Sequence, residues 1–187
     1  MDLKMGDVML CNYAKGQTNP LIMKILDMQQ KLDRGKATHV AIYAGNNKWL
    51  ESGWKGAVFS DMSYGLDNPN YAILRWKDNI DENKMHKIIS KYYEGAKDLG
   101  YSYLGLLSAA ISTVIGYAVF ILTAGKVEWK PVLIKEEKAP FCSELVAEIY
   151  EEYLGTTLSK IKNDVITPND LYRMNRFEAI QDFKEEN

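Results

Sequence analysis

The side chains best suited to chemistry in this sequence include a cysteine that is predicted to begin a helix. Cys142 lies two residues after Pro140, and apolar residues with helical spacing follow it from Leu145 to Leu154. Free backbone N–H groups and the helix dipole at such a helix start favour a thiolate, the nucleophilic form of cysteine. An apolar-flanked cysteine without a partner base is more often a core residue, so the interpretation depends on finding that base.

His39 is the best candidate for the partner base among the two histidines of the chain. It lies in the run Thr38–Tyr43, which is rich in β-branched and aromatic residues and is predicted to form a strand. The other histidine, His86, lies between two lysines on a predicted helix and is expected to be solvated. His39 is therefore the histidine that a predicted strand would hold in a fixed position.

Glu51 is the acidic residue that the sequence places near His39. A turn at residues 44–48 and a second predicted strand, Trp49–Ser52, form a hairpin with the strand that carries His39. If Ile42 pairs with Lys48, His39 lies directly opposite Glu51. A register shift of one residue would instead turn Glu51 to the other face of the sheet.

A thiolate, an imidazole and a polar group that orients the imidazole are the parts of a cysteine hydrolase. Cys142, His39 and Glu51 supply these three residue types. The second cysteine, Cys11, lies in a predicted strand with no charged group nearby in the sequence, so it is expected to be a core residue. The sequence thus indicates one reactive thiol.

The elements that must position these residues are an antiparallel sheet, mostly from the first half of the chain, and several helices. Asn19, Asp81 and Thr167 are predicted helix caps, and Gly155 is the predicted end of the helix that carries Cys142. The predicted strands are residues 8–13, 38–43, 49–52, 57–60, 71–76 and 177–180, with a further candidate at 127–134; the predicted helices are residues 20–32, 81–99, 142–154 and 168–171.

Length and composition limit the classes of protein to which this chain can belong. Its 187 residues are sufficient for a single domain, and a net charge of −2 without a basic cluster disfavours nucleic-acid binding. Two cysteines without CxxC or Cys/His spacing indicate neither a disulfide framework nor a zinc site, and no metal or cofactor is expected. The absence of a basic and then apolar start predicts no export signal and a cytoplasmic location.

One long stretch of the sequence, Tyr101 to Ala124, contains no charged residue. Its length is that of a membrane-spanning helix, but its glycines, serines and threonines make it only moderately hydrophobic and also suit close helix packing. Three interpretations remain open: a buried core helix, a helix in a homo-oligomer interface, and a helix in contact with a membrane or lipid. Membrane association is therefore an alternative to a purely cytoplasmic location.

Five short motifs, taken in the order in which they occur along the chain, resemble those of a known enzyme group. Together they are similar to the circularly permuted, NlpC-type branch of the papain-like cysteine hydrolases, and within that branch they resemble the YiiX-like proteins. The resemblance covers the chain from Gly6 to about Leu171. The motifs are Gly6-Asp7-Val8, Thr38–Tyr43 followed by Glu51, Gly100-Tyr101-Ser102-Tyr103, Phe141-Cys142-Ser143-Glu144-Leu145 and Thr167-Pro168-Asn169-Asp170-Leu171.

The resemblance implies an α+β, papain-like fold in which a small antiparallel β-sheet or barrel packs against helices. It implies that Cys142 is the nucleophile, His39 the base and Glu51 the third catalytic residue. Weaker candidates for substrate binding are Tyr43, which shares the predicted face of His39, and Tyr103 and Ser143. The Cys142 N–H is a candidate donor to an oxyanion, because it lies at a predicted helix start.

The function expected from these residues is hydrolysis of an amide bond in a peptide or small amide, for instance one derived from cell-wall peptide. One alternative is a lipid acyl hydrolase or acyltransferase with the same three residues, for which the uncharged stretch is the evidence. Another is a catalytically silent binding module on the same fold. A reactive Cys142 would separate the two kinds of hydrolase from the silent binding module.

Overall fold

The computed structural model describes residues 1–12, 35–53, 56–63, 70–99, 115, 122, 140–159 and 166–184. The predicted helix at residues 20–32 and the candidate strand at 127–134 lie outside these residues. So does the uncharged stretch 101–124, apart from two isolated positions. No helix among the described residues combines the length and hydrophobicity needed to cross a membrane.

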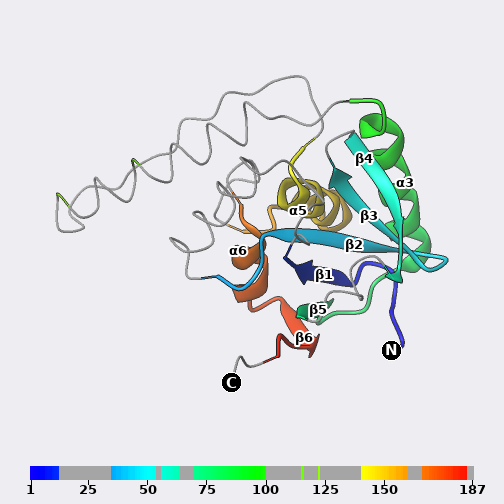
Figure 1. Cartoon of the computed structure of the whole chain (residues 1–187). Coiled ribbons are helices and arrows are strands. Elements are labelled where there is room, and N and C mark those ends of the chain that lie inside the picture. The colour runs from blue at the N-terminus through cyan, green and yellow to red at the C-terminus, as the bar shows by residue number, and fades with distance from the viewer. Residues whose placement is uncertain are drawn as a thin grey trace.

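The described strands form one six-stranded sheet in the order β4-β3-β2-β1-β5-β6, and every neighbouring pair is antiparallel (Figure 1). The α+β class and the antiparallel sheet predicted from the sequence are confirmed. Within the described residues the sheet is open, with β4 and β6 at its edges. The strands are β1 (Val8–Cys11), β2 (His39–Gly45), β3 (Lys48–Gly53), β4 (Gly56–Asp61), β5 (Tyr71–Trp76) and β6 (Phe177–Gln181).

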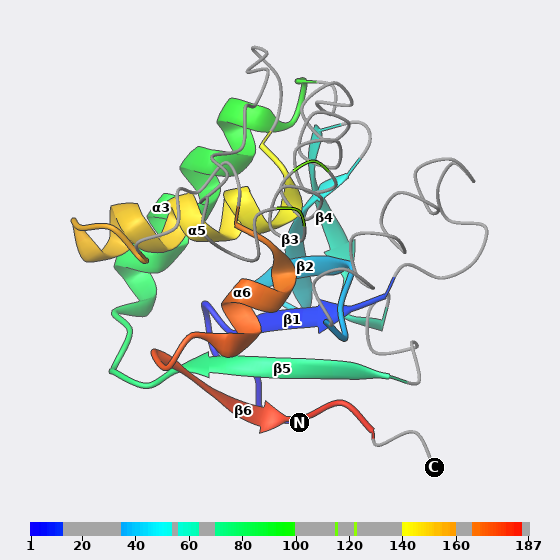
Figure 2. The ribbon, with the colours of Figure 1, turned by 90° about the vertical axis from the view of Figure 1, so that its left-hand side faces the viewer.

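Three described helices accompany the sheet: α3 (Glu82–Ala96), α5 (Cys142–Leu154) and α6 (Pro168–Arg173). Figure 2 shows α3 and α5 on the same side of the sheet. Two predicted caps are confirmed, since the Asp81 side chain accepts a hydrogen bond from the backbone of α3 and Thr167 does the same for α6; Asn19 lies outside the described residues. Gly155 ends α5 in the left-handed conformation at φ 69°, a conformation that glycine adopts without steric cost.

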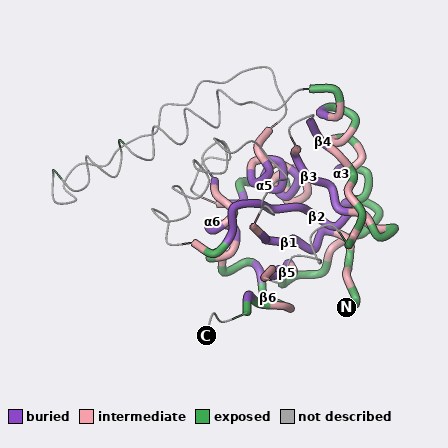
Figure 3. The backbone as a smooth tube through the Cα atoms, viewed as in Figure 1, coloured by how far each residue is buried: buried purple, intermediate pink, exposed green. Residues whose placement is uncertain are grey.

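The hydrophobic core lies between the sheet and the helices, and a second cluster covers the other face. Alternation along the strands sends Leu10 and Ile42 to the helix side, where they pack with Leu145 and Ile149 of α5. The intervening strand residues belong to the second cluster, which contains Met9, Cys11, Ala41, Tyr43, Trp49 and Ile73. The central strands are therefore buried on both faces, as Figure 3 shows for β1 and β2.

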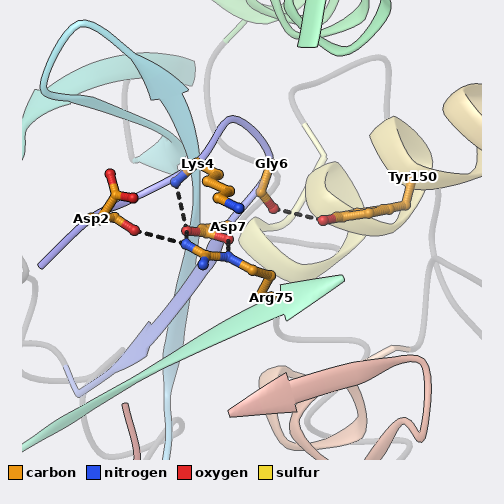
Figure 4. A network of polar contacts seen from close by, with 6 residues as sticks. All are labelled: Asp2, Lys4, Gly6, Asp7, Arg75 and Tyr150. Carbon is orange, nitrogen blue, oxygen red and sulfur yellow. Dashed lines mark hydrogen bonds and ion pairs between the residues drawn. The ribbon is translucent and has the colours of Figure 1, made fainter. Parts of the chain in front are cut away.

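A polar network ties the start of the chain to α5 and β5 (Figure 4). The Tyr150 hydroxyl of α5 donates a hydrogen bond to the Gly6 carbonyl at 2.6 Å. The buried Asp7 carboxylate accepts two hydrogen bonds from Arg75, and its Oδ2 also accepts one from the Lys4 backbone N–H. This network fixes the position of α5 relative to the sheet, and α5 carries the candidate nucleophile.

Candidate active site

His39 and Glu51 lie on neighbouring strands and contact each other directly. The distance between His39 Nε2 and Glu51 Oε2 is 2.5 Å, and both side chains are buried, with exposed fractions of 0% for the histidine and 6% for the glutamate. Strand alternation gives His39 the same face as Ala41 and Glu51 the same face as Trp49. The prediction that the hairpin brings this pair together is confirmed.

The hairpin register differs from the one on which that prediction was based. Ile42 pairs with Leu50 rather than Lys48, and an irregularity lies between Tyr43 and Gly45. The register has moved by two residues, so Glu51 keeps the face of His39 but is its diagonal neighbour rather than its direct partner. Gly45 pairs with Lys48 across a two-residue turn of Asn46 and Asn47, which is tighter than the expected five-residue loop. One extra residue on β2 then changes the pairing by one, so that the net shift is two residues.

A serine on the next strand holds the far side of the Glu51 carboxylate. The Ser60 hydroxyl of β4 donates a hydrogen bond to Glu51 Oε1, the oxygen that does not contact His39. Ser60 pairs with Trp49 across β3 and β4, while Glu51 pairs with Val58. The sequence analysis missed Ser60, although strand alternation from Val58 onward would have placed it on the face of Glu51.

Cys142 is the first residue of α5, as predicted, and its exposed fraction is 7%. The Glu144 carboxylate accepts a hydrogen bond from the Phe141 backbone N–H, which fixes the chain as it enters the helix. The buried Ser52 hydroxyl of β3 donates to the Pro140 carbonyl. The loop before the cysteine is therefore attached to the strand that carries Glu51, an attachment that the sequence analysis did not foresee.

The electrostatics of His39 reflect both of its neighbours. Burial lowers the pKa of His39, but hydrogen bonds to Cys142 and Glu51, together with the charges of these groups, raise it well above its ordinary value of 6.5. Glu51 contacts Nε2, and Nδ1 is the other nitrogen of the ring. Burial raises the pKa of Glu51, but hydrogen bonds from His39 and Ser60 outweigh it and lower the pKa below 4.5. These contacts favour the charged form of His39.

Cys11 lies beside this group but has a different electrostatic environment. It pairs with His39 across β1 and β2 and has an exposed fraction of 3%. Burial is the main cause that raises the pKa of the Cys11 thiol to about 11. The expectation that Cys11 is a core residue agrees with this burial, and it remains a neutral thiol at physiological pH.

The motif at residues 167–171 acts on the start of β2 rather than on the helix that carries the nucleophile. The buried Asn169 side chain of α6 accepts hydrogen bonds from the Lys36 and Ala37 backbone N–H groups at 2.9 and 3.1 Å. Its amide also donates to the Ala37 carbonyl at 3.0 Å. Asn169 therefore fixes the backbone immediately before His39, which the sequence analysis did not predict.

The three candidate substrate-binding residues have different surroundings. The Tyr43 ring packs edge-on against Trp49, and its hydroxyl accepts a hydrogen bond from the Asn47 backbone N–H at the hairpin turn. The Ser143 hydroxyl is buried and donates to the Ile166 carbonyl at 2.6 Å. Tyr103 lies outside the described residues. The described contacts of Tyr43 and Ser143 are thus with the protein's own backbone and core.

The geometry can be compared with that of known proteins. No protein-family model matches the chain, and no curated protein matches it. A solved structure that it resembles is the metalloprotein yiiX of Escherichia coli O157:H7, a DUF1105 protein, with a TM-score of 0.59 and 12% sequence identity. The match covers 96% of this chain and 97% of that one. The chain therefore has a YiiX-like fold, in agreement with the group named from its motifs.

The description of that neighbour raises the question of whether a metal ion would fit among the candidate residues. In the described part of the chain, no three His, Cys, Asp or Glu side chains are arranged to hold a metal ion. His39 Nε2, an atom type that commonly ligates metals, is engaged with Glu51 at 2.5 Å. The described side chains thus do not fit a resident metal, and their chemistry is derived without one.

Proposed function

We propose that this protein is a papain-like, NlpC-type thiol hydrolase that cleaves an amide bond in a peptide or small amide. The observation that carries the proposal is the grouping of Cys142, His39 and Glu51, which are buried at the start of α5 and on two adjacent strands, with direct contact between His39 and Glu51. A nucleophile, a base and a group that orients the base are the parts that this chemistry requires. Peptides derived from the cell wall are one substrate class to examine first.

The reaction would proceed in two stages. His39 Nδ1 holds the proton that the Cys142 thiol has given up, and the thiolate sulfur attacks the carbonyl carbon of the amide. The Cys142 N–H at the start of α5 donates to the developing oxyanion. When the C–N bond breaks, the imidazolium gives its proton to the leaving amine. Water, deprotonated by His39, then attacks the thioester and releases the acid, and the thiol regains its proton.

Glu51 supports both stages without exchanging a proton. Its carboxylate fixes the imidazole orientation through Nε2, so that Nδ1 faces the thiol. Its negative charge stabilises the imidazolium that forms in each stage. The low pKa of Glu51 keeps this carboxylate ionised throughout the physiological pH range.

Alkylation by iodoacetamide tests whether His39 activates Cys142. A thiol with the ordinary pKa of about 8.5 is only about 1% thiolate at pH 6.5. We therefore expect His39→Ala to slow labelling of Cys142 at pH 6.5 by on the order of tenfold or more. Peptide mass spectrometry assigns the label, and Cys11, with a pKa of about 11, should stay unlabelled in the native protein.

His86→Ala is the matched control, because it removes the other histidine from the exposed face of α3. It should leave the labelling rate of Cys142 unchanged. His39→Asn provides a second substitution at the buried site, with circular dichroism of each variant to verify folding. Equal labelling rates in the wild type and in both folded His39 variants would contradict the proposed function.

A lipid acyl hydrolase or acyltransferase is the second candidate, supported by the uncharged stretch Tyr101 to Ala124. The same nucleophile and base would then attack an ester rather than an amide. Flotation with phosphatidylcholine vesicles separates the candidates: co-flotation of the wild type favours the lipid substrate, and its absence removes that support. A silent binding module predicts instead an unreactive Cys142.

A further inference from the structure

Ser60 is a polar side chain beside the candidate site that the proposed mechanism does not use. It lies on the edge strand β4 and is half-buried, whereas Glu51 on the adjacent strand has an exposed fraction of 5%. Its hydroxyl donates to Glu51 Oε1, while Oε2 of the same carboxylate contacts His39. The two oxygens of Glu51 are thus held from opposite sides, by β4 and by β2.

This double attachment matters because the carboxylate torsion of glutamate is broad and intrinsically loose. A contact at one oxygen leaves the plane of the carboxylate free to turn. A second hydrogen bond at the other oxygen fixes that plane, and so fixes the direction in which Oε2 meets His39 Nε2. Hydrogen bonds to ionised groups are the stronger ones, so a hydroxyl donor is well suited to this task.

A purely structural role explains Ser60 less well. An edge strand that faces solvent does not need a hydroxyl on this face to satisfy its backbone, and an apolar side chain at position 60 could extend the second cluster beside Met62. The hydroxyl is instead directed at the buried carboxylate. Its effect on that carboxylate is to lower the pKa of Glu51, the same direction as the effect of His39.

We propose that Ser60 is a positioning residue for the thiol hydrolase, one that acts on Cys142 through Glu51 and His39. The inference rests on the proposed function. It extends the candidate site across three adjacent strands, from Ser60 on β4 through Glu51 on β3 to His39 on β2, and then to Cys142 at the start of α5. Loss of the Ser60 hydroxyl loosens Glu51 and thereby weakens the imidazolium that supports the thiolate.

The test measures iodoacetamide labelling of Cys142 at pH 6.5 in Ser60→Ala and Ser60→Thr. We expect Ser60→Ala to slow labelling by about threefold to tenfold, the effect of one hydrogen bond to a charged group transmitted through Glu51. Ser60→Thr keeps the hydroxyl and suits a strand, so it should label within about twofold of the wild type. Ser63→Ala, the same change at an exposed serine nearby, is the matched control and should have no effect.

The outcomes distinguish this inference from the function on which it rests. Slow labelling in His39→Ala with wild-type labelling in Ser60→Ala overturns the role of Ser60 and leaves the thiol hydrolase intact. Equally slow labelling in Ser60→Ala and Ser60→Thr, with wild-type melting temperatures, also overturns it, because the hydroxyl would then be irrelevant. Wild-type labelling in His39→Ala overturns both proposals.

Discussion

At the scale of single residues, the chemistry of this protein depends on a histidine held between two acidic groups. His39 is fully buried, and an isolated buried imidazole would be neutral because burial disfavours its charged form. Contacts with Cys142 and Glu51 reverse that preference and raise the pKa of His39. A charged His39 of this kind is what the proposed hydrolase requires beside its nucleophile.

Replacing Glu51 with glutamine should lower the pKa of His39. The substitution removes the carboxylate charge and its charge-assisted hydrogen bond but leaves the burial that disfavours the imidazolium. The measurement is an NMR titration of the His39 imidazole signals in the wild type and in Glu51→Gln. A His39 titration unchanged by Glu51→Gln would show that the 2.5 Å contact does not stabilise the charged histidine.

The same pKa shifts define the pH range in which the pair stabilises the fold. The raised pKa of His39 means that its contribution is complete below its ordinary value of 6.5 and is lost as pH rises through the raised value. The lowered pKa of Glu51 means that its contribution is complete above 4.5 and is lost as pH falls through the lowered value. Both contributions are present together between pH 4.5 and 6.5.

At the scale of elements, each candidate residue depends on a local attachment of its own strand or helix. Ser52 attaches the loop before Cys142 to β3, and Asn169 of α6 attaches the segment before His39. At Gly35 a side chain is excluded, since an added Cβ would lie 2.0 Å from Asn169 atoms. The close approach of α6 to the start of β2 therefore requires glycine at this position.

Asn169→Ala should destabilise the fold by about 3 kcal/mol, because it leaves the buried backbone N–H of Ala37 and the part-buried N–H of Lys36 without their acceptor. Urea unfolding measures the change in free energy. Asn79→Ala, the same substitution in an exposed loop, should change it by less than about 0.5 kcal/mol. Equal stability of Asn169→Ala and the wild type would contradict the role assigned to this side chain.

Local signals in the sequence predicted the elements well. Thr167 and Pro168 marked the start of α6, Asp81 the start of α3 and Gly155 the end of α5, because caps and stops act through nearby backbone groups. Period-two alternation likewise located the strands. The predicted hairpin register was wrong by two residues because the turn is tighter than expected and an irregularity at Tyr43–Gly45 adds one residue to β2; the two effects together leave the faces unchanged.

At the scale of the whole molecule, the long-range hydrogen bonds were the part that the sequence could not predict. Ser52 and Pro140 are 88 positions apart, and Asn169 and Ala37 are 132 apart. Such pairs are formed by packing of α5 and α6 against the sheet, which no local pattern specifies. The sequence predicted which residues form the candidate site, Cys142, His39 and Glu51, because each residue type has a chemical role. It did not predict the contacts among them.

The sheet order explains how distant segments meet at one place. β1 and β2 are central and buried on both faces, so the segment that carries His39 is rigid at its base. Packing of α5 against the core, through Leu145 and Ile149, then brings the helix start to this strand. The fold thus brings the start of α5 close to the strand that carries His39.

The measurement that tests the central claim most directly is acyl-enzyme formation with p-nitrophenyl acetate. We predict a burst of nitrophenol with one acetyl group on Cys142, followed by slower steady release as water cleaves the thioester. Cys142→Ser should abolish the burst, and Cys11→Ser should retain it, because the Cys11 thiol, with a pKa of about 11, is protonated at neutral pH. A burst that survives Cys142→Ser, or wild-type protein with no acetyl group on Cys142, would contradict the account.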